Sequence, residues 1–139
     1  MKTQRAFSLL QIMIVIGIIG ILVSLMLPNY QDSVVRSRRT DGQSALFYMA
    51  TQMERAYFDS SSYSTIKLDS KEAKSPEGWY QLEIREQNDE HYLIAAVPTG
   101  AQGKRDTQCQ TLTIDEKGHL GVVDGPAGKP KEVAQGCWS

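Results

Sequence analysis

Apolar and polar residues follow three different patterns along the chain, and each pattern predicts a different kind of element. Residues 7–27 carry no charged side chain. As an α-helix at 1.5 Å per residue, this run would be roughly 30 Å long, which is the thickness of a bilayer core. The first pattern therefore predicts a membrane-spanning helix near the N-terminus.

The second pattern is amphipathic and extends from residue 29 to about residue 58. Apolar residues recur there every three or four positions, which places them on one face of a helix: Leu46, Met49, Ala50, Met53 and Tyr57. Such a stripe is typical of a face that packs into a core. We therefore expect a single helix from Phe7 to about Phe58, the second half of which packs on a sheet.

The third pattern is the period-two alternation of the C-terminal half, which is typical of strands with one buried face. Tyr80, Leu82 and Ile84, for example, alternate with polar residues. Turn-forming residues separate four such runs, which are residues 79–86, 91–97, 109–115 and 119–123. A long helix with four antiparallel strands is an α+β arrangement. Residues 59–78 and the Gly/Pro-rich tail from residue 124 are expected to be loops.

The apolar run has several interpretations. A cleaved secretory signal has a shorter apolar core and ends in a small-x-small site, whereas this run ends in the bulky residues Met26 and Leu27. A signal anchor fits better, with the basic residues of the first six positions on the cytoplasmic side and the rest exported. Two residues are not explained by a plain signal anchor. Gln11 is a costly side chain in lipid, and Pro28 removes a backbone hydrogen-bond donor where the apolar run ends.

The N-terminal residues also carry a specific resemblance. Residues 5–30, RAFSLLQIMIVIGIIGILVSLMLPNY, resemble the N-terminus of a type IV prepilin, with a basic leader, an aromatic first mature residue and an apolar helix. The resemblance implies cleavage between Ala6 and Phe7 by the prepilin peptidase, and N-methylation of the new Phe7 amine. It also implies that Gly20 and Pro28 loosen the helix, and that subunits assemble through this helix.

By this resemblance the chain has three parts. Residues 1–6 are the cleaved leader, residues 7–28 form the transmembrane and polymerisation helix, and residues 29–139 form the periplasmic globular domain with the amphipathic half of the helix. Two positions depart from the family pattern: Ala6 stands where the family has Gly, and Gln11 stands where it has Glu. Glutamine accepts a hydrogen bond but cannot neutralise the N-terminal ammonium of a neighbouring subunit.

Two further motifs lie beyond the apolar run. In RSRRTDGQ, residues 36–43, the arginines are either a solvated helical face with local charge pairing or a contact surface for acidic neighbours in a filament: Arg36, Arg38 and Arg39. The stretch resembles the R-x-x-R-T-[DE]-G-Q signature of minor pilins. The Q-x-x-x-D-x-x-C pattern at residues 102–109 and the later CW pair are similar to PilE-type minor pilins. The resemblance implies the type IV pilin fold, a long helix on a four-stranded antiparallel sheet with a disulfide-closed C-terminal loop.

The chain has two cysteines, Cys109 and Cys137. An exported chain enters an oxidising compartment, so an even number of cysteines favours a disulfide over two free thiols. Closing a loop of this length would stabilise the domain by roughly 3–4 kcal/mol. We therefore predict that the bond holds the tail against the third strand.

The sequence does not indicate an enzyme. His91 and His119 each begin a predicted strand without the further ligands that a metal site needs, so both are expected at the surface. The cysteines and serines lie in no nucleophile motif, and a glycine-rich phosphate loop is absent from the sequence. A net charge of −1 and a pI near 6.1 argue against a nucleic-acid-binding module. We expect no catalytic residue, no metal, no cofactor and no direct binding of nucleic acid.

The favoured function is therefore that of a minor type IV pilin, which primes or joins pili that serve adhesion, twitching motility and DNA uptake. The resemblance implies the major pilin, other minor pilins, the prepilin peptidase and the inner-membrane assembly platform as partners. It places the protein in the inner membrane before assembly and in the pilus afterwards. One alternative is a type II secretion pseudopilin. Another, from a different class, is an uncleaved periplasmic binding domain anchored to the membrane.

Overall fold

The computed structural model of the chain describes residues 8–68, 73–123, 131–132 and 136–138. One helix, α1 (Leu9–Ser60), is 52 residues long and includes the positions of Gly20 and Pro28. The chain separates into two compact units, residues 1–34 and 35–139, and α1 contributes to both. The predicted single helix is confirmed from Leu9 onward, whereas Phe7, its predicted first residue, lies outside the described residues.

The first unit presents the apolar run as exposed surface. Every large apolar side chain from Leu9 to Leu27 is exposed, with fractions between 47% for Val23 and 76% for Leu9. The helix also contains a window that is long and apolar enough to cross a bilayer. These side chains therefore make no core of their own within the first unit.

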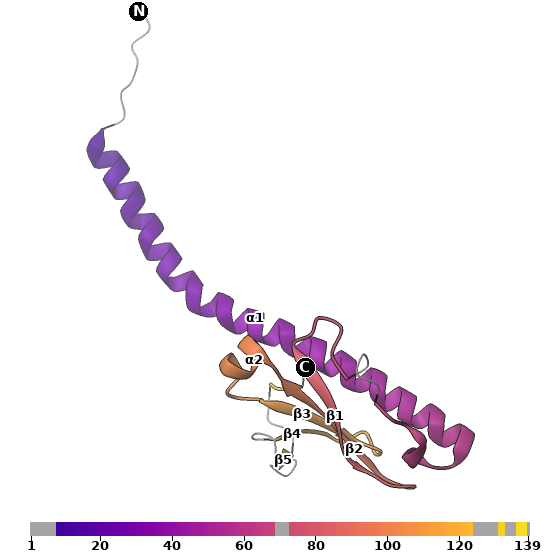
Figure 1. Ribbon diagram of the computed structural model, residues 1–139. Helices are drawn as coiled ribbons and strands as arrows, with labels where there is room; N and C mark the ends of the chain where they lie inside the picture. Colours follow the sequence, from indigo (N-terminus) through magenta and orange to yellow (C-terminus); the bar gives the residue numbers. More distant parts are fainter. Residues whose placement is uncertain (1–7, 69–72, 124–130, 133–135, 139) are drawn as a thin grey trace, which may run out of the picture. The chain divides into compact units, whose positions relative to one another are not determined.

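The second unit contains a five-stranded antiparallel sheet in which the strands follow one another in sequence order (Figure 1). The strands are β1 (Tyr80–Gln87), β2 (Tyr92–Pro98), β3 (Thr111–Asp115), β4 (Leu120–Val123) and β5 (Lys131–Glu132). The first four confirm the predicted strands. The two-residue β5, which pairs with Gly121 and Val122, was not predicted because its Gly- and Pro-rich surroundings indicate a loop.

Two short helical elements were also missed by the prediction. A 3-10 turn, η1 (Tyr63–Thr65), follows α1, and the helix α2 (Gly100–Arg105) connects β2 with β3. Both are too short to show a helical period in the sequence, and α2 contains two glycines, which are poor helix formers.

The core lies between the second half of α1 and one face of the sheet. Four of the five residues of the predicted stripe are buried, while Tyr57 keeps 38% of its surface exposed and stacks on Tyr63. β1 buries alternate positions at its start, as predicted, and Ile94 of β2 faces its partner Ile114 of β3. The expected single buried face is wrong for β3, whose first four residues are all buried. The buried residues of both elements form one cluster, which includes Leu46, Met49, Met53, Tyr80, Leu82, Ile94, Leu112 and Ile114.

Cys109 and Cys137 form a disulfide, as predicted, with their Cα atoms 5.6 Å apart. Cys109 lies two residues before β3, and both sulfur-bearing residues are buried in the core cluster. The bond therefore fixes the end of the chain beside the start of the third strand.

Candidate assembly helix and buried polar centre

Gln11 is the polar residue nearest the start of the exposed apolar segment of α1. Its side chain is exposed, and within the part of the chain that the structure describes it makes no hydrogen bond. The backbone of this helix satisfies its own hydrogen bonds, so the side-chain amide is the group that remains for a partner outside the chain.

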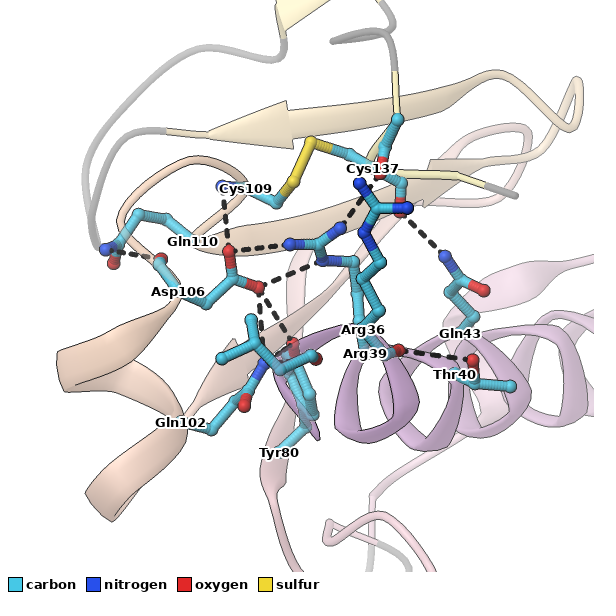
Figure 2. Close-up of polar contacts among 12 residues, drawn as sticks. Arg36, Arg39, Thr40, Gln43, Tyr80, Gln102, Asp106, Cys109, Gln110 and Cys137 are labelled. Atoms are coloured by element: carbon cyan, nitrogen blue, oxygen red, sulfur yellow. Dashed lines mark hydrogen bonds and ion pairs between the residues drawn. A yellow bond between two sulfur atoms is a disulfide. The ribbon is translucent and has the colours of Figure 1, made fainter. Parts of the chain in front are cut away.

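A second group of polar residues is buried where α1 enters the globular unit, and Arg39 is its centre. Arg39 is 5% exposed and Asp106 1%. The guanidinium binds the carboxylate through two hydrogen bonds, Nε to Oδ2 at 3.0 Å and Nη2 to Oδ1 at 2.9 Å (Figure 2). Its remaining nitrogen, Nη1, donates to the carbonyl oxygen of Gly136 at 2.9 Å. Both interpretations of Arg39 from the sequence are therefore wrong, since the side chain neither faces solvent nor is available to a neighbouring subunit.

Asp106 has further donors, which connect α2 and β3 to the same centre. The backbone N–H of Cys109 donates to Oδ1 at 3.1 Å, and the Gln102 amide donates to Oδ2 at 3.3 Å. The Gln102 amide also donates to the hydroxyl of Tyr80 at 3.0 Å and to the carbonyl of Val35 at 3.2 Å. These hydrogen bonds to the Asp106 carboxylate compensate the cost of desolvation that a lone buried charge would have.

The hydroxyl of Tyr80 remains protonated in this centre. Burial is the largest cause that raises the pKa of Tyr80 to about 12, and the nearby Asp106 carboxylate raises it further, against the opposing hydrogen bond from Gln102. A neutral phenol can occupy the apolar interior beside an ion pair without adding a third charge.

Asp41 connects α1 to the segment that leads into β1. Its carboxylate accepts hydrogen bonds from the Ser75 hydroxyl, from the backbone N–H of Glu77 at 3.0 Å and, more weakly, from that of Trp79 at 3.4 Å. Ser75 Oγ in turn accepts from the backbone N–H of Tyr80 at 3.0 Å. The Asp41 carboxylate thus binds the residues that precede β1 and fixes them to α1.

Gly42 and Gln43 complete the same stretch of helix. A Cβ atom at Gly42 would lie 2.8 Å from two ring carbons of Tyr80, so only glycine permits this approach of helix and strand. The Gln43 amide donates to the carbonyl oxygen of Cys137 at 2.7 Å, which fixes the tail. Of the five residues from Arg39 to Gln43, which we call the signature segment, only Thr40 is exposed.

The structure brings some of the sequence-predicted site residues together and leaves others apart. Cys109 and Cys137 adjoin the buried centre, whereas Gln11 and the positions of Gly20 and Pro28 belong to the first unit. Ala6 and Phe7 lie outside the described residues. Sequence reasoning assigned no role to Gln102 or Asp106, although the motif that contains them was noted.

The two histidines are at the surface, as predicted. His91 contacts Glu116 at 3.0 Å, and His119 contacts Asp115 at 2.9 Å. Among the residues that the structure describes, no group of three or more His, Cys, Asp or Glu side chains is arranged to hold a metal.

The polar centre has a structural role. It connects α1, β1, α2 and the C-terminal tail through one ion pair and its hydrogen bonds.

The chain is similar in sequence to fimbrial proteins and to a type II secretion system core protein. Over 59 residues the chain is 39% identical to a fimbrial protein of Pseudomonas aeruginosa, a match that covers 42% of this chain and 38% of that protein. Over 66 residues it is 34% identical to the type II secretion system core protein G of Dickeya chrysanthemi, covering 48% and 43% respectively. The matches span less than half the length of these curated relatives.

Solved structures agree on the fold. The non-core minor pilin PilV of Neisseria meningitidis aligns with a TM-score of 0.54 at 17% identity, over 72% of this chain and 97% of that one. A type IV pilin from Shewanella oneidensis aligns with a TM-score of 0.51 at 28% identity, over 76% and 98%. The chain thus has the type IV pilin fold, and these structural neighbours are pilins.

The particular family follows from a family model described as "Type IV minor pilin ComP, DNA uptake sequence receptor", which matches residues 28–113. The match covers more than half of the chain and includes both the signature segment and the Gln102–Cys109 motif. The chain belongs to this family of type IV minor pilins.

Proposed function

We propose that the protein is a minor pilin subunit that is stored in the inner membrane and incorporated into type IV pili through the apolar half of α1. The family match supports this function, and one structural observation carries it. The segment Leu9–Leu27 exposes all of its large apolar side chains. In water that exposure would be unfavourable, so the segment needs lipid before assembly and other pilin helices afterwards.

Processing is the first step of the proposed function. Residues 1–6 act as the leader, the prepilin peptidase cuts between Ala6 and Phe7, and the Phe7 amine is methylated. The mature chain then has the transmembrane and polymerisation helix at residues 7–28 and the periplasmic domain at residues 29–139. Its partners are the major pilin, other minor pilins and the inner-membrane assembly platform.

Assembly uses the polar and small residues of the apolar segment. Gln11 offers its amide to a neighbouring N-terminus. Gly20 lacks a side chain and therefore allows another helix to approach closely. Pro28 lacks a backbone N–H and weakens the helix at the end of the segment. Because Gln11 supplies a dipole and not a charge, we expect a low copy number and a place near the pilus tip.

The intact mass of protein extracted from membranes or sheared pili tests this processing. We expect the mass of a chain that begins at Phe7 and carries one methyl group. An N-terminus at Met1 would support the uncleaved, membrane-anchored binding domain instead, and an N-terminus beyond Leu27 would show a conventional signal peptide.

A type II secretion pseudopilin is the second candidate, and the similarity to a secretion system core protein favours it. Both functions require the same processing, so the mass measurement does not separate them. Deletion of the gene does: loss of pili with normal protein secretion supports the pilin function, and the reverse supports the pseudopilin.

The family description raises direct binding of DNA as a third candidate, since it names a receptor for a DNA uptake sequence. The composition of this chain predicts the opposite. Titration of the full-length protein in detergent with a labelled DNA duplex at low and moderate salt tests it. Sequence-dependent binding that persists at moderate salt would establish DNA as a ligand, while binding that disappears with salt for every sequence would be non-specific.

A further inference from the structure

Three exposed cations belong to two adjoining helical turns of the globular unit: Arg36, Lys104 and Arg105. Arg36 belongs to the first turn of α1 in this unit, and the other two form the last turn of α2. The hydrogen bond from the Gln102 amide to the Val35 carbonyl, 3.2 Å long, holds α2 beside that first turn. We call these three residues the basic patch.

The charges of the basic patch are not neutralised within the globular unit. Among the described residues, none of the three side chains forms an ion pair. Asp106, which directly follows Arg105, is already paired with the buried Arg39. Two exposed acids lie in the vicinity, Asp32 one helical turn before Arg36 and Glu77, which accepts from the Trp79 ring.

Arg38 adds a fourth positive charge at the same end. Its guanidinium carbon lies 3.7 Å from the ring centroid of Trp79, a cation–π contact that keeps the charge. Four cations therefore stand against the two exposed carboxylates and the buried carboxylate of Asp41, so the net charge of this end is positive.

The other end of the same unit is acidic. Asp59 lies in the last turn of α1, and the turn between β1 and β2 contributes Asp89 and Glu90, all exposed. The Ser62 hydroxyl holds Asp89 at 2.7 Å next to the end of α1. Since α1 continues for 25 residues between Val35 and Ser60, the two ends are roughly 38 Å apart. The globular unit therefore has a charge dipole whose positive end is the one that connects to the apolar segment.

The chain length between the apolar segment and the basic patch is short. Leu27 ends the apolar run and Arg36 follows nine residues later, which corresponds to roughly 13 Å along a helix. The polar headgroup layer outside a bilayer core is about 5–8 Å thick on each side. The connection therefore tethers Arg36, and the unit to which it belongs, to within a short distance of the headgroup layer.

We propose that the basic patch docks the globular unit onto the phosphates of anionic lipid headgroups while the subunit is stored in the membrane. The proposal rests on the proposed membrane storage. A basic residue near an anionic surface strengthens binding roughly fivefold. The apolar segment tethers the patch to the bilayer, so that docking is intramolecular and benefits from a high effective concentration. The acidic end is repelled from the same surface. Duplex DNA lacks this tethering, which is why the lipid surface is favoured.

The test uses the full-length protein reconstituted in vesicles that carry a headgroup-linked spin label, which quenches tryptophan. Trp79 and Trp138 report how close the globular unit is to the surface. Vesicles of phosphatidylcholine alone are compared with vesicles that also contain phosphatidylglycerol, at low and high salt. The variant is Arg36→Gln/Lys104→Gln/Arg105→Gln. The control is Arg55→Gln/Lys67→Gln/Lys117→Gln, which removes the same charge from exposed positions elsewhere in the unit.

We expect phosphatidylglycerol to increase quenching of the wild type and of the control, and high salt to reverse the increase. The patch variant should lose the increase, because three charges correspond to roughly a hundredfold weaker docking. Equal quenching of wild type and patch variant would overturn the proposal. So would displacement of the domain by a short DNA duplex at an equal concentration of phosphate, which would assign the patch to nucleic acid. Failure of the wild type to float with the vesicles would instead contradict membrane storage itself.

Discussion

The two halves of α1 distribute their side chains in opposite ways. In the segment from Leu9 to Leu27 the apolar side chains are exposed, whereas in the signature segment, Arg39–Gln43, three polar residues and a glycine are buried. Folding of a single chain normally buries apolar groups and exposes polar ones. The two halves therefore differ in what covers them. The apolar side chains of the first half need contacts outside the chain, whereas the buried side chains of the signature segment bind other residues of the same globular unit.

The largest effect is expected from Asp106→Ala. The substitution leaves the Arg39 guanidinium buried without its carboxylate and should lower the free energy of unfolding by about 3–5 kcal/mol. Urea unfolding of the full-length protein in detergent, followed by tryptophan fluorescence, measures it. As a control, Glu77→Ala removes an exposed carboxylate and should change little. The double variant Arg39→Met/Asp106→Leu removes both charges and should recover most of the loss. If it does not, the ion pair and its hydrogen bonds make a net contribution to stability beyond the avoidance of an unpaired buried charge.

Loss of the disulfide should have the next largest effect. Cys109→Ser/Cys137→Ser opens a loop with a sequence separation of 28 residues, which should cost roughly 3–4 kcal/mol. The tail carbonyls that accept hydrogen bonds from Arg39 and Gln43 would then lose their covalent connection to the core, although Trp138 still packs against Phe47. The same unfolding experiment on the wild type with and without reductant checks this value. Unchanged stability after full reduction, verified by thiol labelling, would contradict the prediction.

A pair of glycine substitutions compares the two halves of α1 directly. Gly42→Ala places a methyl group 2.8 Å from ring carbons of Tyr80 and should destabilise the domain by about 1–2 kcal/mol, since the strain exceeds the gain in helix propensity. Gly17→Ala meets nothing within 4 Å and should leave unfolding of the globular unit unchanged. Equal effects of the two substitutions would mean that the signature segment is not tightly packed against β1.

Stability should also fall at alkaline pH because of Tyr80. Its pKa is raised from 10.0 to about 12, chiefly by burial, so the unfolded state loses the phenolic proton first. The stabilisation is complete below pH 10 and is lost as the pH rises toward 12, by about 1 kcal/mol near pH 11. Tyr63, whose pKa burial also raises to about 12, acts in the same direction. Unfolding curves at several pH values measure this loss, and Tyr80→Phe should make it shallower; an equally steep loss in that variant would exclude Tyr80 as its cause.

Gln11→Glu should have the smallest effect on the fold and a visible one on assembly. Gln11 belongs to the first unit, and its exposed side chain makes no hydrogen bond among the described residues, so the unfolding free energy of the globular unit should not change. A carboxylate can pair with the N-terminal ammonium of a neighbour, and charge-assisted hydrogen bonds are about twice as strong as neutral ones. Immunogold labelling of sheared pili should therefore show more copies along the shaft for the variant. Equal labelling density would show that charge at this position does not determine placement.

The sequence predicted the elements of this fold better than its connections. Local periodicity was sufficient for α1 and for β1 to β4, because burial of one face repeats at fixed spacing. It could not predict that Arg39 pairs with Asp106, which is 67 residues away, since an ion pair leaves no periodic signal. The two residues lie in separate motifs, and the available hint was a glycine inside a predicted helix, Gly42, three residues after Arg39. The apolar run was recognised because its pattern requires no tertiary information.

We expect the apolar half of α1 to contact other pilins, while the buried face of its second half contacts only its own domain. A photo-crosslinking amino acid at Ile19, which is 53% exposed, or at Leu46, which is fully buried, tests it in cells that assemble pili. We predict adducts between Ile19 and other pilin subunits in sheared filaments, and only intramolecular products from Leu46. Absence of the chain from sheared filaments, or pilin adducts from Leu46 but none from Ile19, would contradict the claim.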